Sequence, residues 1–315
     1  MTRVAVAGLG DVSVVHLAAI SSLGADLVGV CDVDPTRAGD GYRDHRALLD
    51  ATRPDVLHIC TPHDQHVQLA IDALERGVNV LMEKPVAHTV AEASRLVEAA
   101  AAHPAVKIGV CLQNRYNASS EKVRKVLANQ AANGGSATVF WHRTPDYYRA
   151  SPWRGDKARS GGGVLINQAI HTIDLMQWFL GDVEAVSGHA GRYGGLPGDV
   201  EDTAHLLLDH EGGARSVVFA TTTNVVDQPV TIEIVTDEAV LTIKNGLTIA
   251  YADGRTEAIE ERRADGGGRD YWGASHELLI ADFYRTLEDP EPFWIGPAEA
   301  LKSQYLIDQI YRSDT

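Results

Sequence analysis

Cysteines are few in this chain, and long apolar runs are missing. Its 315 residues include three cysteines, Cys31, Cys60 and Cys111, which stand far apart in or beside apolar segments. This spacing argues against a cysteine metal site and is typical of reduced, buried cysteines in cytoplasmic proteins. No apolar run reaches the roughly 20 residues that span a bilayer, so we expect no membrane partner. The first strand-like run begins at residue 3, which leaves no room for a signal peptide and favours a cytoplasmic location.

Positive charge is also scarce. Lys and Arg number 28 against 43 Asp and Glu, which gives a formal net charge of −15. Non-specific nucleic-acid binding needs a basic surface, so we expect no nucleic-acid partner. A chain of 315 residues is longer than one core usually accommodates, and we therefore expect two domains.

Residues 3 to about 111 alternate strand-like and helical runs. The helical stretches cover about residues 14–22, 65–75 and 89–102. The strand-like runs are near-continuous in apolar residues, as expected for strands buried on both faces, and cover residues 4–7, 27–32, 55–61, 78–82 and 107–112. Repeated strand–helix units of this length predict an α/β fold with a doubly wound parallel sheet, a Rossmann domain, over residues 1–117.

The pattern changes after residue 117. We expect a helix over about 118–132, a strand over 137–143, and a helix over about 164–180 that ends at Gly181. Between residues 183 and 251, about six strand-like runs joined by short polar or glycine turns predict an open, mostly antiparallel sheet.

The last part of the chain is expected to return to helices. A flexible loop is predicted at Asp265–Gly268, followed by helices over about 276–287 and 298–312. We therefore assign an α+β second domain to residues 118–295 and a terminal helix to residues 296–315.

A glycine turn follows the first strand, with the sequence Gly8-Leu9-Gly10-Asp11-Val12. In a dinucleotide-binding fold, the first two glycines let the backbone turn tightly and approach the pyrophosphate, whose charge the N-terminus of the next helix stabilises. Ser13 stands where this motif has its third glycine, and it is small enough to pack. We predict that this turn binds a dinucleotide.

Asp32 ends the second strand, at about the distance of 20 residues that the dinucleotide fingerprint requires. A carboxylate there can hold both ribose hydroxyls of NAD and would repel the 2′-phosphate of NADP. We therefore predict NAD as the cofactor, while the nearby Arg37 leaves NADP possible. The alternative for Asp32 is a carboxylate that serves only the strand end or a turn.

Lys84 follows the fourth strand in the triplet Glu83-Lys84-Pro85. The carboxyl ends of the strands border the ligand crevice in doubly wound sheets, and the proline prevents the strand from continuing. An ammonium group there can hydrogen-bond a substrate hydroxyl and share in its deprotonation. The alternative is a surface lysine paired with Glu83.

The predicted helix after Gly161-Gly162-Gly163 carries the second set of reactive groups. Asn167 and His171 are four residues apart and share a helix face, which Asp174 borders. Imidazole is well suited to accept a proton near neutral pH, as an alcohol must lose one when it is oxidised. The alternative for His171 is a packed core residue, although three glycines indicate a close approach of the backbone.

Other residues are expected to line the same cleft. Thr61, Pro62, His63 and His66 follow the third strand and should lie near the cofactor, as should Glu83 and Lys84 after the fourth strand. Because two histidines come without a third ligand, we predict no metal there.

A further group is expected to contact the substrate. It comprises Arg115, which follows the last strand of the first domain, and Tyr147, Tyr148, Trp153 and Arg154 in the loop before the glycines. Aromatic rings stack on sugar faces, and arginine holds hydroxyl, carboxylate or phosphate groups. An ordinary packed loop is the alternative.

Together these motifs resemble the Gfo/Idh/MocA oxidoreductase family, which includes glucose–fructose oxidoreductase and inositol dehydrogenases. The matching segments run in order and are Gly8-x-Gly10, Cys31-Asp32-Val33-Asp34, Thr61-Pro62-His63-x-x-His66, Glu83-Lys84-Pro85, and Gly161-Gly162-Gly163 with Asn167-x-x-x-His171-x-x-Asp174. The resemblance implies a nucleotide-binding domain and a C-terminal sheet that often forms an oligomer interface, hence a homodimer or homotetramer. It also implies that the last helix packs back on the first domain.

The resemblance further implies that Lys84 and His171 act at the substrate carbinol. Inositol dehydrogenases of the family often carry aspartate where this chain has Asn167, which is neutral and cannot raise the basicity of a neighbour by charge. The division of labour between Lys84 and His171 therefore stays open, and the substrate class widens to nucleotide-linked sugars.

We therefore expect an NAD(P)-dependent dehydrogenase or reductase that acts on a CH–OH group of a sugar, sugar derivative or cyclitol. The amine of Lys84 and the imidazole of His171 should converge on the nicotinamide pocket. Two alternatives remain: a redox-neutral, NAD-assisted cleavage or elimination of glycosides, and a non-catalytic protein that senses NAD or sugar.

Overall fold

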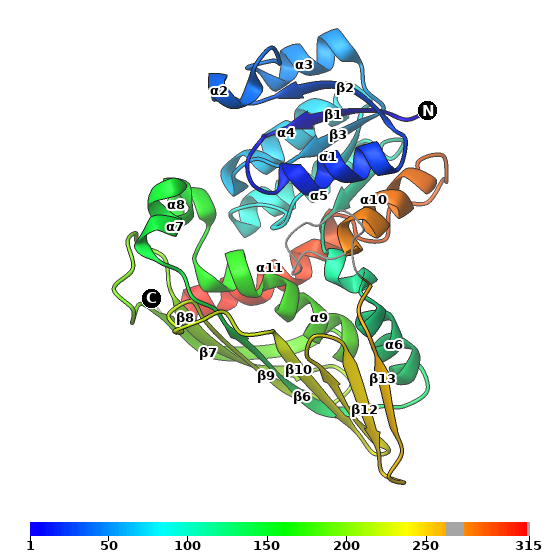
Figure 1. The fold of residues 1–315 in the computed structure, drawn as a ribbon, viewed down its shortest axis with the longest axis vertical. Helices are drawn as coiled ribbons and strands as arrows, with labels where there is room; N and C mark the ends of the chain where they lie inside the picture. The colour runs from blue at the N-terminus through cyan, green and yellow to red at the C-terminus, as the bar shows by residue number, and fades with distance from the viewer. Residues whose placement is uncertain (263–273, 314–315) are drawn as a thin grey trace. The chain divides into compact units, whose positions relative to one another are not determined.

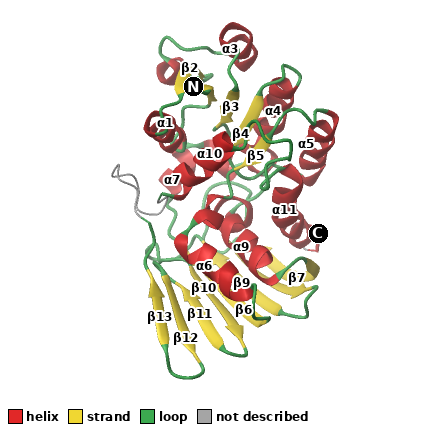
Figure 2. Ribbon diagram, turned by 90° about the vertical axis from the view of Figure 1, so that its right-hand side faces the viewer, coloured by secondary structure: helices red, strands yellow, loops and turns green. Residues whose placement is uncertain are grey.

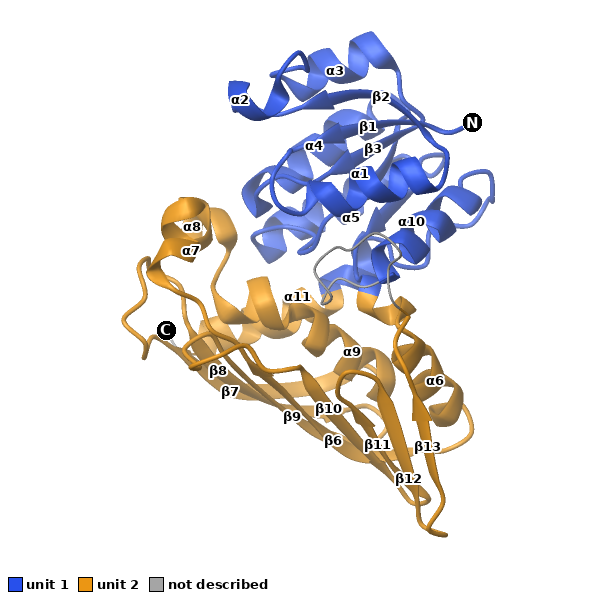
Figure 3. Cartoon of the chain, in the orientation of Figure 1, with its two compact units in different colours: residues 1–113, 263–301 blue, residues 114–262, 302–315 orange. Residues whose placement is uncertain are grey.

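The computed structural model describes residues 1–262 and 274–313. The chain forms two compact units, one of residues 1–113 and 263–301 and the other of residues 114–262 and 302–315 (Figure 3). The glycine-rich segment Asp265–Gly268 lies outside the described residues. Over the described ranges, no helix has the length and apolar character needed to cross a membrane.

The first unit contains a parallel sheet with the strand order β2-β1-β3-β4-β5. Its first three strands along the chain, β1, β2 and β3, are labelled in Figure 1. Its strands are β1 (Arg3–Ala7), β2 (Asp26–Cys31), β3 (Val56–Ile59), β4 (Asn79–Met82) and β5 (Ile108–Val110). All were predicted, because strands covered on both faces leave near-continuous apolar runs in the sequence. The order reverses between β1 and β3, and the carboxyl ends at such a reversal form the usual ligand crevice.

Helices accompany this sheet. They are α1 (Ser13–Ser22), α2 (Pro35–Ala38), α3 (His45–Thr52), η1 (His63–Gln65), α4 (His66–Leu74), α5 (Val90–Ala102) and α10 (Ser275–Arg285). The expected helices of this unit are confirmed, whereas α2 and α3 were not foreseen. Each of these two begins at an aspartate cap, Asp34 or Asp44, whose side chain accepts a backbone N–H of the first turn. Although far away in sequence, α10 packs against α1 (Figure 2).

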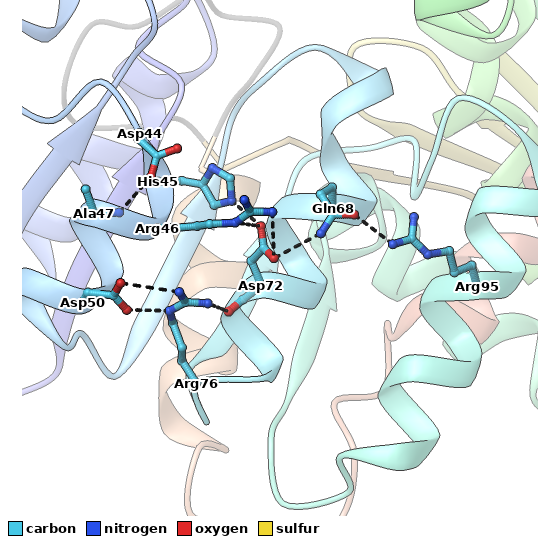
Figure 4. Close-up of polar contacts among 9 residues, drawn as sticks. All are labelled: Asp44, His45, Arg46, Ala47, Asp50, Gln68, Asp72, Arg76 and Arg95. Atoms are coloured by element: carbon cyan, nitrogen blue, oxygen red, sulfur yellow. Dashed lines mark hydrogen bonds and ion pairs between the residues drawn. The ribbon is translucent and has the colours of Figure 1, made fainter.

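A polar network joins α3, α4 and α5 on this unit (Figure 4). The carboxylate of Asp72 accepts hydrogen bonds from Arg46 and from Gln68, and Gln68 in turn accepts one from Arg95. Burial raises the pKa of Asp72, but its hydrogen bonds from Arg46, His45 and Gln68 outweigh burial and leave the pKa lowered. The carboxylate therefore stays ionised and links three helices.

The second unit is built on a sheet with the order β13-β12-β11-β10-β6-β9-β8-β7. Its strands are β6 (Ala132–Phe140), β7 (Val183–Gly191), β8 (Thr203–His210), β9 (Arg215–Thr221), β10 (Thr231–Thr236), β11 (Ala239–Ile243), β12 (Leu247–Tyr251) and β13 (Thr256–Ile259). β6 and β9 pair in parallel, and the other neighbours pair antiparallel. The predicted open, mostly antiparallel sheet is thus confirmed.

The start of β6 differs from the prediction. The helix α6 (Ala118–Leu127) ends earlier than expected, and β6 begins at Ala132. A Cβ on Gly134 would lie 2.5 Å from the carbonyl oxygen of Arg215, and one on Gly135 would lie 2.6 Å from that of Glu233. The two glycines therefore let the backbones of the neighbouring strands approach β6 closely, although in the sequence they look like a turn.

One face of this sheet is packed and the other is open. The helices α6 and α9 (Ile170–Leu180) cover the packed face, where apolar side chains of both layers form the core (Figure 2). On the open face Leu207 and Val217 pair across β8 and β9 and are 46% and 43% exposed. The last helix, α11 (Pro297–Ser313), contains the division between the two units.

Candidate active site

The glycine turn begins with a backbone contact that excludes any side chain. Gly8 has φ +89°, and a Cβ there would lie 2.6 Å from the carbonyl oxygen of Cys60. Its N–H donates to the carbonyl of Cys31 at 2.8 Å. The turn after β1 is thus held against the ends of β2 and β3, and only glycine fits at this position.

The surroundings of this turn fit the phosphates and ribose of a dinucleotide. Apart from its two neighbours in the chain, none of the described residues lies within 4 Å of a Cβ built on Gly10, so the backbone there is open to a ligand. Val12 is the N-cap of α1, and its apolar side chain makes no cap hydrogen bond, although the N–H groups of Ser13 and Val15 donate to the carbonyls of Gly10 and Val12. The hydroxyl of Thr61, next to Gly8, is buried and has no hydrogen-bond partner among residues 1–262 and 274–313.

Asp32 makes two contacts with backbone at the expected ribose site. Its Oδ2 accepts a hydrogen bond from the N–H of Leu9 at 2.7 Å, and its Oδ1 accepts one from Asp34 at 2.8 Å. The carboxylate therefore stabilises the glycine turn itself. This agrees with the alternative role for Asp32, that of a carboxylate that serves a turn. Contact of Asp32 with a ribose stays a prediction. Arg37 is exposed, and its Nε lies 3.7 Å from Oδ2 of Asp34.

Lys84 lies at the carboxyl end of β4 between two buried residues. Glu83 continues the ladder by donating its N–H to Ile59 at 2.9 Å, and the Lys84–Pro85 peptide is cis. Lys84 is half-buried, whereas Glu83 and Pro85 are buried. The carboxylate of Glu83 accepts hydrogen bonds from the imidazoles of two histidines, so it is not a dedicated surface partner of the lysine.

His63 and His66 lie at the carboxyl end of β3, as expected, and both are buried. Their ring centroids are 5.8 Å apart. In the described part of the chain, a different set brings potential metal ligands together: His16, Glu83 and Cys111, with ligand atoms within 4.8 Å of one another. None of these three was expected to bind a metal.

In the second unit, the glycines before the predicted helix make close contacts within the protein. A Cβ on Gly162 would lie 2.1 Å from the hydroxyl of Tyr311, and one on Gly163 would lie 1.8 Å from the carbonyl oxygen of Glu201. The Glu201 carboxylate accepts hydrogen bonds from the N–H groups of Gly163 and Leu165 and from the Tyr311 hydroxyl. The expected close approach is confirmed, and its partners are Glu201 and Tyr311.

The helix itself begins differently from the prediction. Residues Val164–Ala169 form a π-helix, and α9 follows from Ile170 and ends at Gly181. Within the described run 162–177, Asn167 alone is half-exposed, while His171 is 6% exposed. A π-helical turn is frequent at functional sites, because it changes which side chains share a face.

Arg115 is buried rather than presented to solvent. Its side chain is 1% exposed, and it pairs with the carboxylate of Asp174. The guanidinium also lies 5.2 Å from the ring centroid of Trp178. Direct contact of Arg115 with a substrate stays a prediction.

The segment before the glycines was expected to be a loop but forms the short helices α7 (Pro145–Ala150), η3 (Pro152–Gly155) and α8 (Lys157–Ser160). Aromatic and arginine side chains stack on it. The guanidinium of Arg154 lies 4.6 Å from the ring centroid of Tyr147 and 5.6 Å from that of Trp153. Arg143 lies 5.3 Å from the Tyr147 centroid. Burial raises the pKa of the Tyr148 hydroxyl, so this group stays protonated.

Gln168 was not among the predicted site residues, although the structure joins it to Tyr147. Gln168 directly follows Asn167, and its amide donates to the hydroxyl of Tyr147 at 3.1 Å. Glu201 was missed as well, since a lone acidic residue before a strand carries no motif.

The fold and the turn geometry define a dinucleotide-binding Rossmann domain followed by an α+β domain on an open sheet. Residues 2–110 match the model of an oxidoreductase family with an NAD-binding Rossmann fold, and residues 132–242 match the GFO/IDH/MocA C-terminal domain. Together the two matches cover more than half of the chain. The chain therefore belongs to the Gfo/Idh/MocA family of oxidoreductases, and its first domain is of the NAD-binding type.

Individual relatives agree with this assignment. The chain is 30% identical over 229 residues to the D-apiose dehydrogenase of Paraburkholderia graminis (68% of this chain, 59% of that protein). It is 28% identical over 226 residues to inositol 2-dehydrogenase 2 of Saccharopolyspora erythraea (67% and 64%). The matched region thus spans about three fifths of the length of these curated relatives.

A solved structure resembles the chain over nearly its whole length. It is that of the WlbA dehydrogenase from Bordetella pertussis, in complex with NADH and UDP-GlcNAcA. The TM-score is 0.84 at 26% identity, and the match covers 99% of this chain and 96% of the other.

Proposed function

We propose that this protein is an NAD-dependent oxidoreductase that transfers a hydride between nicotinamide and a secondary alcohol of a sugar, sugar derivative or cyclitol. The observation that carries the proposal is the place of Lys84, a half-buried cation at the carboxyl end of β4 in an NAD-binding domain. The buried residues on either side, Glu83 and Pro85, restrict the position of Lys84. A group that acts on a bound substrate must be held in a fixed position.

The glycine turn, Thr61 and Asp32 would hold the cofactor. Bound NAD would supply the hydride acceptor, which no side chain can replace. In this proposal Lys84 donates a hydrogen bond to the reacting oxygen of the alcohol, and His171 takes the hydroxyl proton. Asn167, the half-exposed residue one turn before His171, orients a neighbouring hydroxyl.

The stack of Tyr147, Trp153 and Arg154 supports a substrate with several hydroxyl groups. Aromatic faces pack against sugar rings, and guanidinium groups hold hydroxyl, carboxylate or phosphate oxygens in fixed directions. The relatives named above act on apiose and inositol or bind a nucleotide-linked sugar. We therefore place the substrate of this chain among sugars, nucleotide sugars and cyclitols.

We further propose that the protein is a cytoplasmic homodimer or homotetramer that associates through the open face of the second sheet. Leu207, Val217 and Val235 on the strands of this sheet are 46%, 43% and 38% exposed. Apolar side chains on an open sheet face are stabilised by burial against a second copy.

A panel of sugars, cyclitols and nucleotide sugars with NAD and NADP tests the proposed activity. We expect NADH to form with at least one compound, and Lys84→Ala or His171→Ala to lower kcat by about 10²- to 10⁴-fold. Both variants should keep their affinity for NADH, which fluorescence titration measures. Sugar release without NADH would instead support the redox-neutral alternative, and wild-type turnover that survives Lys84→Ala would contradict the proposed role of the lysine.

A further inference from the structure

Two histidines from distant parts of the chain meet at the carboxylate of Glu83. Nε2 of His16, on α1, and Nε2 of His276, on α10, each lie 3.0 Å from the same oxygen, Oε1. The side chains of His16, His276 and Glu83 are 0%, 4% and 7% exposed. Burial alone raises the pKa of Glu83, but the hydrogen bonds from His16 and His276 outweigh it and hold the pKa well below the usual range. Glu83 is therefore a buried anion.

The hydrogen-bond partners fix the tautomers of a connected chain. An ionised Glu83 only accepts, so Nε2 of His16 must donate. Burial lowers the pKa of both His16 and His58, so both rings are neutral. Nδ1 of His16 then accepts from Nδ1 of His58, 2.8 Å away, and Nε2 of His58 accepts from the Tyr284 hydroxyl, 2.8 Å away. In this series of hydrogen bonds, from Tyr284 through His58 and His16 to Glu83, each donor has one acceptor.

A third histidine contacts the other side of the triplet. Nδ1 of His66 lies 2.8 Å from the carbonyl oxygen of Pro85, and Nε2 lies 2.9 Å from that of Thr61. Burial lowers the pKa of His66, and the bonds to the two carbonyls oppose this shift. A neutral imidazole carries one N–H, so His66 donates to one of these two carbonyls at a time, and its ring lies between the turn after β3 and the turn after β4. Residues on both sides of Lys84 are therefore held by buried imidazoles, and we call His16, His66 and His276 the histidine clamp.

We propose that the histidine clamp positions Lys84 for reaction, with His16 and His276 acting through Glu83 and His66 acting through Pro85. The inference rests on the proposed function, in which Lys84 meets the substrate. Lys84 is joined directly to Glu83 and Pro85, so contacts that hold the Glu83 side chain and the Pro85 carbonyl restrict the backbone from which the Lys84 side chain projects. The three histidines are positioning residues, because their contacts are with Glu83 and backbone.

The same region could be thought to hold a metal, since His16, Glu83 and Cys111 lie within 4.8 Å. A metal bound beside Glu83 would need a lone pair on Nε2 of His16. In the hydrogen-bond arrangement described above, this nitrogen carries a proton and donates to Glu83. Burial also raises the pKa of the Cys111 thiol well above its usual value, and the Glu83 charge adds to this, which favours a neutral thiol over a thiolate ligand. The contacts therefore favour the hydrogen-bonded clamp.

The test measures the chemical reactivity of the Lys84 amine and needs no substrate. Trace acetylation with acetic anhydride over a pH series, followed by peptide mass spectrometry, gives the reactivity of Lys84 relative to exposed Lys125 in the same molecule. His16→Phe removes both contacts of that ring, and His16→Gln keeps a donor toward Glu83. His210→Gln is the matched control, a buried histidine (2% exposed) in the second unit that bonds Gly181 and Ser216.

We expect His16→Phe and His276→Phe to change the relative reactivity of Lys84 by about threefold or more, because a displaced amine has different neighbours. His16→Gln should restore most of the wild-type value, and His210→Gln should leave it unchanged. With a compound that the wild type oxidises, His16→Phe should lower kcat by about 10- to 100-fold while NADH affinity is kept.

Unchanged Lys84 reactivity in folded His16→Phe and His276→Phe proteins would overturn the proposal, whatever the activity. One equivalent of zinc retained by the purified protein through gel filtration would also overturn it. Because acetylation needs no turnover, these outcomes are separate from a failure of the proposed function, which would show as no NADH formation by the wild type.

Discussion

Arg115 and Asp174 form a buried ion pair with two parallel hydrogen bonds. Nε of Arg115 donates to Oδ2 of Asp174 at 2.9 Å, and Nη2 donates to Oδ1 at 2.7 Å. Arg115 lies in η2 (Gln113–Tyr116), where the chain enters the second unit, and Asp174 lies on α9, three residues beyond His171. The pair therefore fixes the helix that carries His171 to the start of this unit.

Removal of one partner should be costly. Arg115→Met leaves the Asp174 carboxylate buried without its main counter-ion, and we expect the free energy of unfolding to fall by about 3–5 kcal/mol. The double variant Arg115→Met/Asp174→Leu should recover much of this loss. Urea unfolding measures both, with Arg149→Met as the control, because its pair with Asp146 is exposed and should contribute little. Equal losses in Arg115→Met and Arg149→Met would contradict this interpretation.

Two glycines of the first turn should behave differently. Gly8→Ala forces a Cβ against the Cys60 carbonyl at a positive φ, so we expect it to lower the free energy of unfolding by about 2 kcal/mol or more. Gly10→Ala meets open space and should fold normally, yet its methyl group would occupy the place of a bound phosphate. Thermal unfolding and NADH titration separate the two effects. Gly10→Ala protein with wild-type NADH affinity would count against the proposed phosphate position.

The glycine before the π-helix should be needed for folding of the second unit. A Cβ on Gly163 would lie 1.8 Å from the Glu201 carbonyl oxygen, which no side-chain movement can relieve. We expect Gly163→Ala to lower the urea midpoint by an amount equivalent to about 2–4 kcal/mol. Gly212→Ala is the control, because none of the described residues lies within 4 Å of a Cβ there. Similar midpoints for the two variants would show that the backbone moves freely at residue 163.

Stability should decrease in mild acid. The pKa values of His16, His58 and His66 are lowered in the folded protein, chiefly by burial. The unfolded chain therefore binds more protons below its ordinary histidine pKa of about 6.5, and each such group lowers the free energy of unfolding by up to about 1.4 kcal/mol per pH unit. Their contribution is present above pH about 6.5 and is lost as the pH falls toward the folded pKa values.

Urea unfolding between pH 7.5 and pH 5.5 measures this effect. The slope of stability against pH should become smaller in His66→Asn by an amount that corresponds to about one proton. A wild-type slope of zero over this range would contradict the prediction, because it would mean that the folded and unfolded states bind the same number of protons.

The sequence predicted the parallel sheet well, because each buried strand appears as a short apolar run between helices. It also predicted the carboxyl ends of these strands to within two residues, and with them the places of Gly8 and Lys84. Asp32, expected as the last residue of the second strand, follows the end of β2 at Cys31. The start of β6 could not be predicted, since Gly134-Gly135 resembles a turn unless the neighbouring strands β9 and β10 are known. The π-helix before α9 was also hidden, because the apolar spacing of its residues fits an ordinary helix.

The histidine clamp could not be foreseen for a different reason. His16 lies in an apolar helix, Glu83 was considered only as a neighbour of Lys84, and His276 opens a helix near the other end of the sequence. Their contact depends on the packing of α10 against α1, which no local pattern encodes. Arg115 presents the same difficulty, because its partner Asp174 is 59 residues away.

The first unit is built from two segments that are far apart in the sequence, and this limits how relatives can recombine. Residues 1–113 supply Glu83, His16 and His58, whereas His276 and Tyr284 arrive only with residues 263–301. A genetic crossover near residue 113 would join a carboxylate from one parent to hydrogen-bond donors from another. A domain exchange between relatives therefore preserves this cluster only if α10 comes from the same parent as the first sheet.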